Sequence, residues 1–288
     1  MSIQSLSIMV PCGGHCINNC KFCVSRMRDD EAIFGKEIIN ANNIPDSYIN
    51  RIKYVRDAGC DNIIFTGTTE PQQNLPFIYA LLKKNFELPK PFYNIAIQTT
   101  GTNLIYEDIK NLADNGITTL ALSVSAFLPE HNWEIIQTPE AARKMTVDKL
   151  IAAAKECGMN VRVCLNMTDA FSFYSFDYII QWAKYLNVDQ ITFRKIYNSN
   201  TDSEQDKWIA QHKYSTGNLL KIESLVKEKG TPIRILPFGA TLYDCDGLGI
   251  VIDNDCMAKH NINEMRYAIL RPNNKLYSSW DLKGSLIY

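Results

Sequence analysis

Residues 5–23 read SLSIMVPCGGHCINNCKFC, a short apolar run that ends in a cysteine-rich loop. The run Ser5–Pro11 is too short for a buried helix and predicts a β-strand. In the loop that follows, Cys16, Cys20 and Cys23 stand four and three residues apart. The glycines at 13 and 14 give the backbone room to bend, so the three sulfurs can converge on one inorganic centre.

The number of thiols in this loop carries chemical information, because a closed [4Fe–4S] site uses four thiolates. Three thiolates leave one iron free for an outside ligand, just as a catalytic zinc site keeps an open position. The spacing therefore predicts an open cluster on Cys16, Cys20 and Cys23. The alternative is a zinc site in which His15 or Cys12 joins the three thiols.

Outward from the loop, strand-like and helix-like segments alternate along the chain. Continuous hydrophobicity at residues 63–65 and 120–122 indicates burial on both faces, as in a parallel sheet covered by helices. We therefore expect an α/β fold, either a partial parallel barrel or a doubly wound sheet, with active residues at the carboxyl ends of the strands. The further predicted strands are Asn62–Thr66, Tyr93–Thr99, Thr118–Ser125, Asn160–Met167 and Asp189–Ile196, and the predicted helices are Asp46–Ala58, Leu75–Asn85, Tyr106–Asn115, Pro139–Cys157 and Phe176–Leu186.

The rhythm changes after Ile196, which predicts two parts, residues 1–198 and an α+β C-terminal extension over residues 199–288. The extension begins with a helical region that reaches about Lys229, and shorter strand-like runs follow it. Within it, the turn-forming residues Pro272–Lys275 predict an antiparallel pair between Tyr267–Leu270 and Leu276–Ser278. We expect this extension to cap the open side of the barrel and to shape the substrate site.

Composition excludes several classes of protein. The 288 residues are 46% hydrophobic and 21% charged, which excludes a disordered or collagen-like chain. A net charge of −1 and a pI near 6.4 offer no general attraction for large nucleic acids or anionic membranes. No apolar run approaches a membrane span, and the first basic residue is Lys21, so no secretory signal is recognised and the cytoplasm is expected.

The loop resembles the signature of the radical SAM superfamily, C-x3-C-x2-C after the first strand, with Phe22 as the aromatic residue before the last cysteine. The resemblance implies a partial parallel (β/α)6 TIM-like barrel with a [4Fe–4S] cluster on Cys16, Cys20 and Cys23. It also implies that S-adenosylmethionine binds the fourth iron through its amino and carboxylate groups. Both cofactors are therefore expected.

The resemblance further implies an activity. An electron from the reduced cluster would cleave the sulfonium and give a 5′-deoxyadenosyl radical, which removes a hydrogen atom from a substrate. We expect a small molecule or a nucleotide as substrate, with a peptide or a glycyl-radical partner as alternatives. An external one-electron donor such as flavodoxin or ferredoxin is implied. A non-catalytic zinc- or iron-binding interaction module is the alternative from another class.

Further matches to the family lie at other strand ends. The segment Gly67-Thr68-Thr69-Glu70-Pro71 resembles the GGEP segment, so Gly67, Thr68, Thr69 and Glu70 are expected to hold the methionyl amino group of the cofactor. Both family glycines are Thr here. Since Thr tolerates positive φ poorly, we expect Gly67 to supply the bend. A helix N-terminal acid is the structural alternative for Glu70.

Later strands supply the remaining candidate cofactor contacts. The segment Gln98–Thr102, which contains Thr99, resembles the TNG turn of the family, and Ser123 and Ser125 resemble its S-x-D segment. Asn166 sits where members often contact the ribose or the carboxylate, and Arg162, four residues earlier, is expected on the same face. The serines have a plain alternative as polar strand residues.

The other cysteines are expected to be structural or are left unassigned. Cys60 and Cys157 lie at helix ends and Cys164 lies in a strand, where Cys usually behaves as a small buried hydrophobe. Cys245 and Cys256 are too few to hold an auxiliary cluster by themselves.

Overall fold

The computed structural model describes residues 2–236, 240–253, 264–265 and 267–288. Its strands are β1 (Ser2–Ile3), β2 (Leu6–Met9), β3 (Asn62–Thr66), β4 (Asn94–Thr99), β5 (Thr119–Val124), β6 (Asn160–Asn166), β7 (Gln190–Arg194), β8 (Thr231–Ile235), β9 (Thr241–Cys245), β10 (Leu248–Asp253), β11 (Glu264–Met265), β12 (Ala268–Arg271) and β13 (Lys275–Tyr277). Its α-helices are α1 (Asp30–Phe34), α2 (Asp46–Asp57), α3 (Leu75–Phe86), α4 (Tyr106–Asp114), α5 (Pro129–Ile136), α6 (Val147–Glu156), α7 (Phe176–Tyr185), α8 (Glu204–His212) and α9 (Thr216–Lys229).

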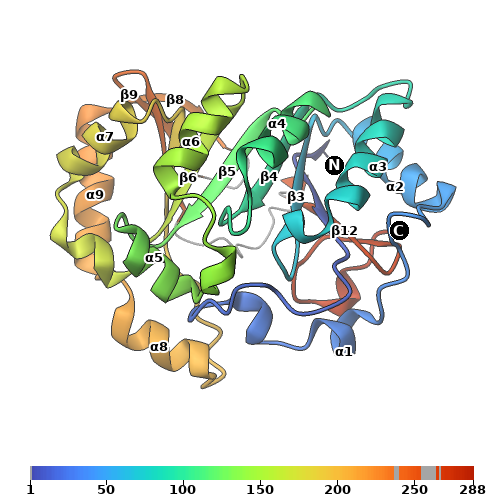
Figure 1. Ribbon diagram of the computed structural model, residues 1–288, viewed down its shortest axis with the longest axis horizontal. Coiled ribbons are helices and arrows are strands. Elements are labelled where there is room, and N and C mark those ends of the chain that lie inside the picture. The colour runs from blue at the N-terminus through green and yellow to red at the C-terminus, as the bar shows by residue number, and fades with distance from the viewer. Residues whose placement is uncertain (1, 237–239, 254–263, 266) are drawn as a thin grey trace.

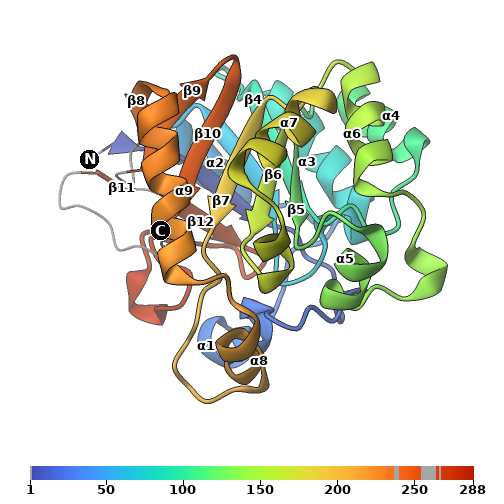
Figure 2. The ribbon, with the colours of Figure 1, turned by 90° about the vertical axis from the view of Figure 1, so that its left-hand side faces the viewer.

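Within the described residues, one 11-stranded sheet forms the centre, in the order β13-β12-β2-β3-β4-β5-β6-β7-β10-β9-β8. From β12 through β10 the neighbouring strands are parallel, and antiparallel strands lie outside them at both edges. Helices α3, α4 and α6 pack along one face of the sheet (Figures 1 and 2). Because the outermost strands β13 and β8 are not paired with each other, the sheet of the described residues is open, as in a partial barrel.

The two faces of the parallel strands differ in chemistry. Side chains such as Phe65, Ile97 and Leu122 are fully buried in the hydrophobic core that the sheet shares with the helices. The register places Gln98 beside Ala121 and Ala121 beside Arg162, so these residues point to the opposite face. We call this second face the inner face. Its polar residues include Gln98, Ser123, Arg162 and Asn166.

The predicted α/β class and the six predicted strands are confirmed, with end shifts of one or two residues, as β2 through β7. The antiparallel pair around Pro272–Lys275 is also confirmed, as β12 and β13. Strands from the predicted extension belong to the same sheet as β2 through β7. Strand β10 pairs with β7, and β12 pairs with β2.

The predicted helix Pro139–Cys157 is wrong in its first half. A short 3-10 turn at Glu140–Ala142 ends at Arg143, and the α-helix begins only at Val147. The backbone at Arg143 is not helical, with φ −82° and ψ +74°. In this conformation Arg143 stacks over the Trp133 ring at 5.4 Å and its Nε donates to the carbonyl of Thr138, contacts that stabilise the break. Helix α5 was not predicted at all.

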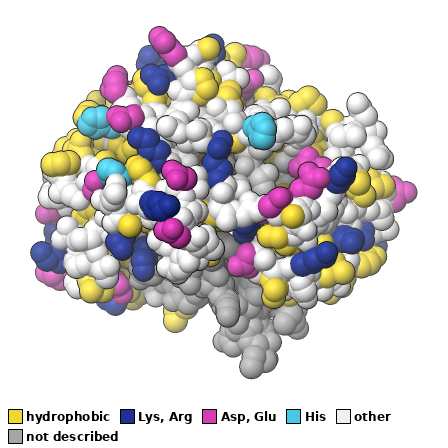
Figure 3. Space-filling model, turned by 90° about the horizontal axis from the view of Figure 1, so that it is seen from below, with side chains coloured by type: hydrophobic (Ala, Val, Ile, Leu, Met, Phe, Trp, Pro, Cys, Tyr) yellow, Lys and Arg dark blue, Asp and Glu magenta, His cyan; other side chains and the backbone are white. Residues whose placement is uncertain are grey.

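No helix in the described part of the chain is long and apolar enough to cross a membrane. Seen from below, the molecular face at which the parallel strands end mixes acidic and basic side chains (Figure 3). This mixture agrees with the near-neutral net charge of the chain.

Substitution of Gly101 by Ala tests how tightly the turn after β4 is packed. The φ of Gly101 is +80°, and a Cβ added there would overlap Cδ1 of the buried Leu150. We expect Gly101→Ala to lower the free energy of unfolding by about 2–4 kcal/mol, from backbone strain plus overpacking. Gly158, at φ +73° with open space around it, is the matched control and should lose only about 1–2 kcal/mol. Equal losses in urea unfolding would contradict the packing argument.

Candidate functional site

The cysteine loop follows β2 and is fixed to its surroundings through its backbone. The amides of Asn19 and Lys21 donate to the carbonyls of Ile136 and Ile135, both at 3.1 Å, at the end of α5. The amide of Ile17 donates to Oε1 of Gln73 at 2.9 Å. The loop therefore has a set conformation against α5 and the segment after β3.

The thiols of Cys16, Cys20 and Cys23, on one eight-residue segment of the loop, are free, and all three residues are partly exposed. Burial raises the pKa of Cys16 and raises that of Cys20 well above its usual value. The negative charges of Cys23, Glu70 and Cys16 raise the pKa of Cys20 further. The thiol of Cys12 contacts the carbonyl of Glu70 at 3.7 Å.

Within the described residues, no three His, Cys, Asp or Glu side chains lie close enough together to hold one metal ion. A zinc site needs its ligands around a single ion, whereas the three thiolates of a cubane bind three different irons.

Glu70 is the acidic centre beside this loop and is only 7% exposed. Its Oε2 accepts hydrogen bonds from Thr99 Oγ1 at 2.5 Å, the Thr100 amide at 3.1 Å and Gln72 Nε2 at 3.0 Å. Its Oε1 accepts from Thr100 Oγ1 at 2.9 Å and from Asn18 Nδ2 at 3.3 Å. The carboxylate thus joins the cysteine loop to the turn after β4.

Asn18 is the residue of this network that the sequence did not single out. Its side chain is 1% exposed, and its Oδ1 accepts hydrogen bonds from the hydroxyls of Thr102 and Thr138, both at 3.0 Å. Its neighbour Asn19 is exposed. Nothing in the local sequence says which of the two asparagines faces inward, because the partners come from distant segments.

No residue of the segment Gly67–Pro71 has a positive φ. The expectation that Gly67 supplies the bend through a positive φ is therefore wrong. Gly67 is instead required by close packing. A Cβ there would lie 3.3 Å from the carbonyl oxygen of Thr69 and 3.4 Å from that of Val10. The two Thr residues are therefore compatible with this backbone. The hydroxyl of Thr69 is buried and has no hydrogen-bond partner.

Two predicted site residues are brought together around Gln98 on the inner face. Gln98 Nε2 donates to Ser123 Oγ at 2.8 Å, and Arg162 Nη2 approaches Gln98 Oε1 at 3.5 Å. Nε of Arg162 is buried without a hydrogen-bond partner. Gln98 lies in the segment that resembles the TNG turn, although it was not itself predicted as a contact.

Ser125 and Asn166 form a second, more buried pair at the strand ends. Ser125 is fully buried, and Asn166 Nδ2 donates to its hydroxyl at 3.4 Å. Asn166 lies on the same face of β6 as Arg162, as alternation along a strand predicts. The pair therefore lies beside the Ser123 and Arg162 group.

Phe22 packs against a residue far away in the sequence. The centroid of its ring lies 6.0 Å from that of Trp208 on α8.

The two cysteines of the C-terminal part are Cys245 and Cys256. Cys245 is buried beside Gly230, where an added Cβ would lie 2.7 Å from the Cys245 sulfur. Cys256 lies outside the described residues.

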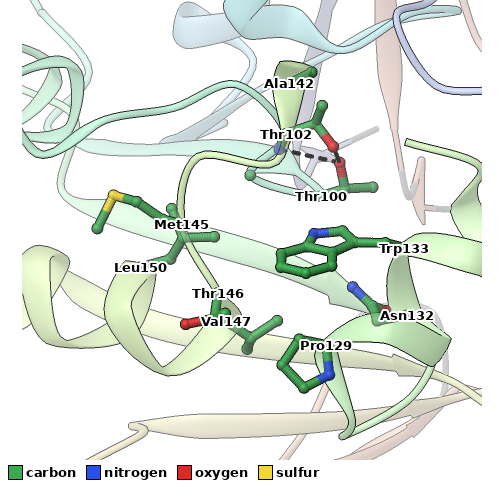
Figure 4. Close-up of a pocket in the computed structure, with 11 residues that line it drawn as sticks. Thr100, Thr102, Pro129, Asn132, Trp133, Ala142, Met145, Thr146, Val147 and Leu150 are labelled. Carbon is green, nitrogen blue, oxygen red and sulfur yellow. Dashed lines mark hydrogen bonds between the residues drawn. The ribbon is translucent and has the colours of Figure 1, made fainter. Parts of the chain in front are cut away.

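Two cavities near the barrel differ in size and place. A cavity of about 10 Å³ lies between the Thr100–Thr102 turn, α5 and α6 (Figure 4). It has room for one water molecule at most, so it does not accommodate a nucleoside. A groove of about 770 Å³ between α3 and α4, which includes Phe86 and Gly116, lies at the amino ends of the strands, away from the cysteines.

Asn18→Asp tests whether the buried amide holds the cysteine loop. The change keeps the shape of the side chain but places a second carboxylate against Glu70 Oε1, where Asn18 now donates. We expect a loss of about 2–3 kcal/mol in unfolding free energy and less iron bound after reconstitution. The matched control is Asn19→Asp at the exposed neighbour. Wild-type iron content in Asn18→Asp would contradict this role.

Solved structures similar to this chain share its fold across nearly its whole length. SuiB of Streptococcus suis bound to the precursor peptide SuiA has a TM-score of 0.63 at 15% identity, over 96% of this chain and 59% of SuiB. SuiB bound to S-adenosylmethionine gives a TM-score of 0.63 at 15% identity, over 96% and 60%. Native anSMEcpe with bound AdoMet gives 0.60 at 14% identity, over 98% and 76%. This chain thus spans about three fifths of SuiB. No curated protein matches the sequence.

The sequence itself matches the family described as the radical SAM superfamily over residues 10–186, more than half of the chain. The match includes the cysteine loop, β3 through β6 and α2 through α7. Members of this superfamily are enzymes that use a [4Fe–4S] cluster and S-adenosylmethionine. The chain therefore belongs to the radical SAM superfamily, and these are its cofactors.

Proposed function

We propose that this protein cleaves S-adenosylmethionine reductively and uses the resulting 5′-deoxyadenosyl radical to remove a hydrogen atom from its substrate. The observation that carries the proposal is the group of neighbouring thiols after β2, joined by Asn18 to the buried Glu70. When bound, the cluster supplies the electron for the cleavage.

The thiols fit the cluster. Cys16, Cys20 and Cys23 would hold three of its irons, while Cys12 stays beside the carbonyl of Glu70. Burial raises the pKa of Cys16 and Cys20, and bound iron would stabilise their thiolates.

One buried polar atom supports a cofactor site on the inner face. Among the buried polar atoms of the described residues that have no hydrogen-bond partner, Nε of Arg162 lies beside the predicted contacts Ser123 and Asn166, and such an atom is costly unless a ligand or water pairs with it. We assign the methionyl amino group to the segment Gly67–Glu70 and the carboxylate to Arg162. Glu70 also keeps the loop against the turn after β4, through Asn18 and Thr100.

We assign the remaining predicted contacts to the nucleoside half of the cofactor. Ser123, Ser125 and Asn166 stand on neighbouring strands β5 and β6, and Thr99 accepts the amide of Gly101 at the end of β4. Phe22 closes the loop against α8. These residues come from successive strand ends, where parallel α/β folds place their ligands.

We propose a small molecule or a nucleotide as substrate, and one observation favours a second candidate, a peptide. The likeness to SuiB, which was solved with its precursor peptide, extends over 96% of this chain and so includes the C-terminal residues. The electron donor is proposed to be an external protein such as flavodoxin or ferredoxin. The residues after 198 are proposed to shape the substrate side.

Anaerobic reconstitution tests the function. The wild-type chain should bind about four irons and four sulfides and release 5′-deoxyadenosine from S-adenosylmethionine after reduction. Alanine at Cys16, Cys20 or Cys23 should abolish both, whereas Cys12→Ala should keep both, because Cys12 lies outside the C-x3-C-x2-C motif. Tight stoichiometric zinc without cleavage would contradict the proposal and favour the interaction module.

Arg162→Gln tests the carboxylate assignment. Loss of a charge-assisted pair should raise the KM for S-adenosylmethionine by about tenfold or more, with iron content unchanged. Arg234, on the exposed strand β8, provides the matched control, because Arg234→Gln should leave the KM unchanged. An unaltered KM in Arg162→Gln would remove Arg162 from the cofactor site.

A further inference from the structure

Helix α8 lies outside the residues that match the family, yet it reaches the cluster loop. The family match ends at residue 186, and α8 spans Glu204–His212. In Figures 1 and 2, α8 lies at the lower end of the molecule near the dark blue loop. The contact is the ring of Trp208 against that of Phe22, centroids 6.0 Å apart at 32°. Phe22 directly precedes the cluster ligand Cys23.

The amino end of α8 is held by one buried carboxylate. The side chain of Asp206 is 5% exposed and accepts hydrogen bonds from the backbone amides and the hydroxyls of Ser199, Thr201 and Ser203. Burial alone would raise the pKa of Asp206, but the hydrogen bonds from Ser199 and Ser203 lower it below its usual value. The preceding loop is therefore wrapped around the first turn of the helix.

The carboxyl end of α8 is held by the segment that follows β6. Nδ1 of His212 lies 3.0 Å from Oδ2 of Asp169, and the amide of Tyr214 donates to the carbonyl of Met167 at 3.0 Å. The ring of His212 stacks on that of Trp208, with centroids 4.6 Å apart at 22°. Fixed at both ends, α8 presents Trp208 to the loop in one orientation.

We propose that Trp208 is a positioning residue for the cluster loop, holding Phe22, and through it the backbone at Cys23, in the conformation that receives the cluster. Two other supports of the loop come from α5 and from Gln73, which lie within the residues that match the family. Trp208 is the aromatic support from the C-terminal part of the chain. The inference rests on the proposed function only in taking this loop as the cluster site.

Two measurements on the full-length chain test the role of Trp208. Amide hydrogen exchange before reconstitution reports on Asn19 and Lys21, whose amides donate to α5. Iron release to a chelator after reconstitution reports on the loaded loop. In Trp208→Ala both rates should rise about three- to tenfold, the range expected for losing an aromatic pair. Trp208→Phe should recover most of the difference because it keeps a ring beside Phe22.

Trp182→Ala is the control, since Trp182 packs on Phe127 at 4.6 Å and its ring contact does not involve the loop. It should leave the Asn19 and Lys21 exchange rates and the iron release rate at wild-type values. Wild-type rates in a folded Trp208→Ala variant, or equal increases in Trp182→Ala, would overturn the proposal. If Trp208→Ala does not fold, the same two rates are measured in Trp208→Leu, where they should also rise because the ring is lost. Failure of the wild-type chain to cleave S-adenosylmethionine would reject the proposed function but leave the exchange result valid.

Discussion

Hydrogen bonds around one buried carboxylate organise the site. Glu70 accepts from Thr99 and Thr100 after β4, and from Asn18 inside the cysteine loop. Asn18 in turn accepts from Thr102 and Thr138. A buried charge of this kind is stable only when its oxygens are satisfied, so the loop, the β3 end and the β4 turn must take their places together. The three thiols are positioned by the same arrangement.

The two faces of the sheet differ in chemistry. One face meets the helices through side chains such as Ile97, Leu122 and Val163, all fully buried. The inner face carries Gln98, Ser123, Arg162 and Asn166 instead, linked by sparse and partly long hydrogen bonds. A barrel filled for stability alone would carry branched apolar residues there. The inner face has the hydrogen-bonding character that a polar nucleoside cofactor requires.

The C-terminal residues are integrated into the fold rather than appended to it. Strands β10 and β12 extend the parallel sheet at both edges, and α8 brings Trp208 to Phe22. A buried Arg271 at the end of β12 donates to Asp30 at 2.8 Å and stacks on Phe34, just after the cluster loop. The ends of the sheet and the loop are therefore coupled through contacts between residues far apart in the chain. This coupling is consistent with a likeness to SuiB that covers nearly the whole chain.

By itself, the sequence determined the α/β class and the strands β2 through β7, because these depend on local hydrophobic runs, and it singled out Cys16, Cys20 and Cys23 by their spacing within eight residues. It also placed Ser123 and Asn166 near strand ends and Arg162 on the same face as Asn166, since alternation along a strand is local. Tertiary structure alone decided that Asn18 rather than Asn19 faces Glu70, that Gly67 packs against Val10 without positive φ, and that Trp208 meets Phe22. Each of these depends on a partner from a distant segment, and no local pattern encodes the distance between segments that only folding brings together.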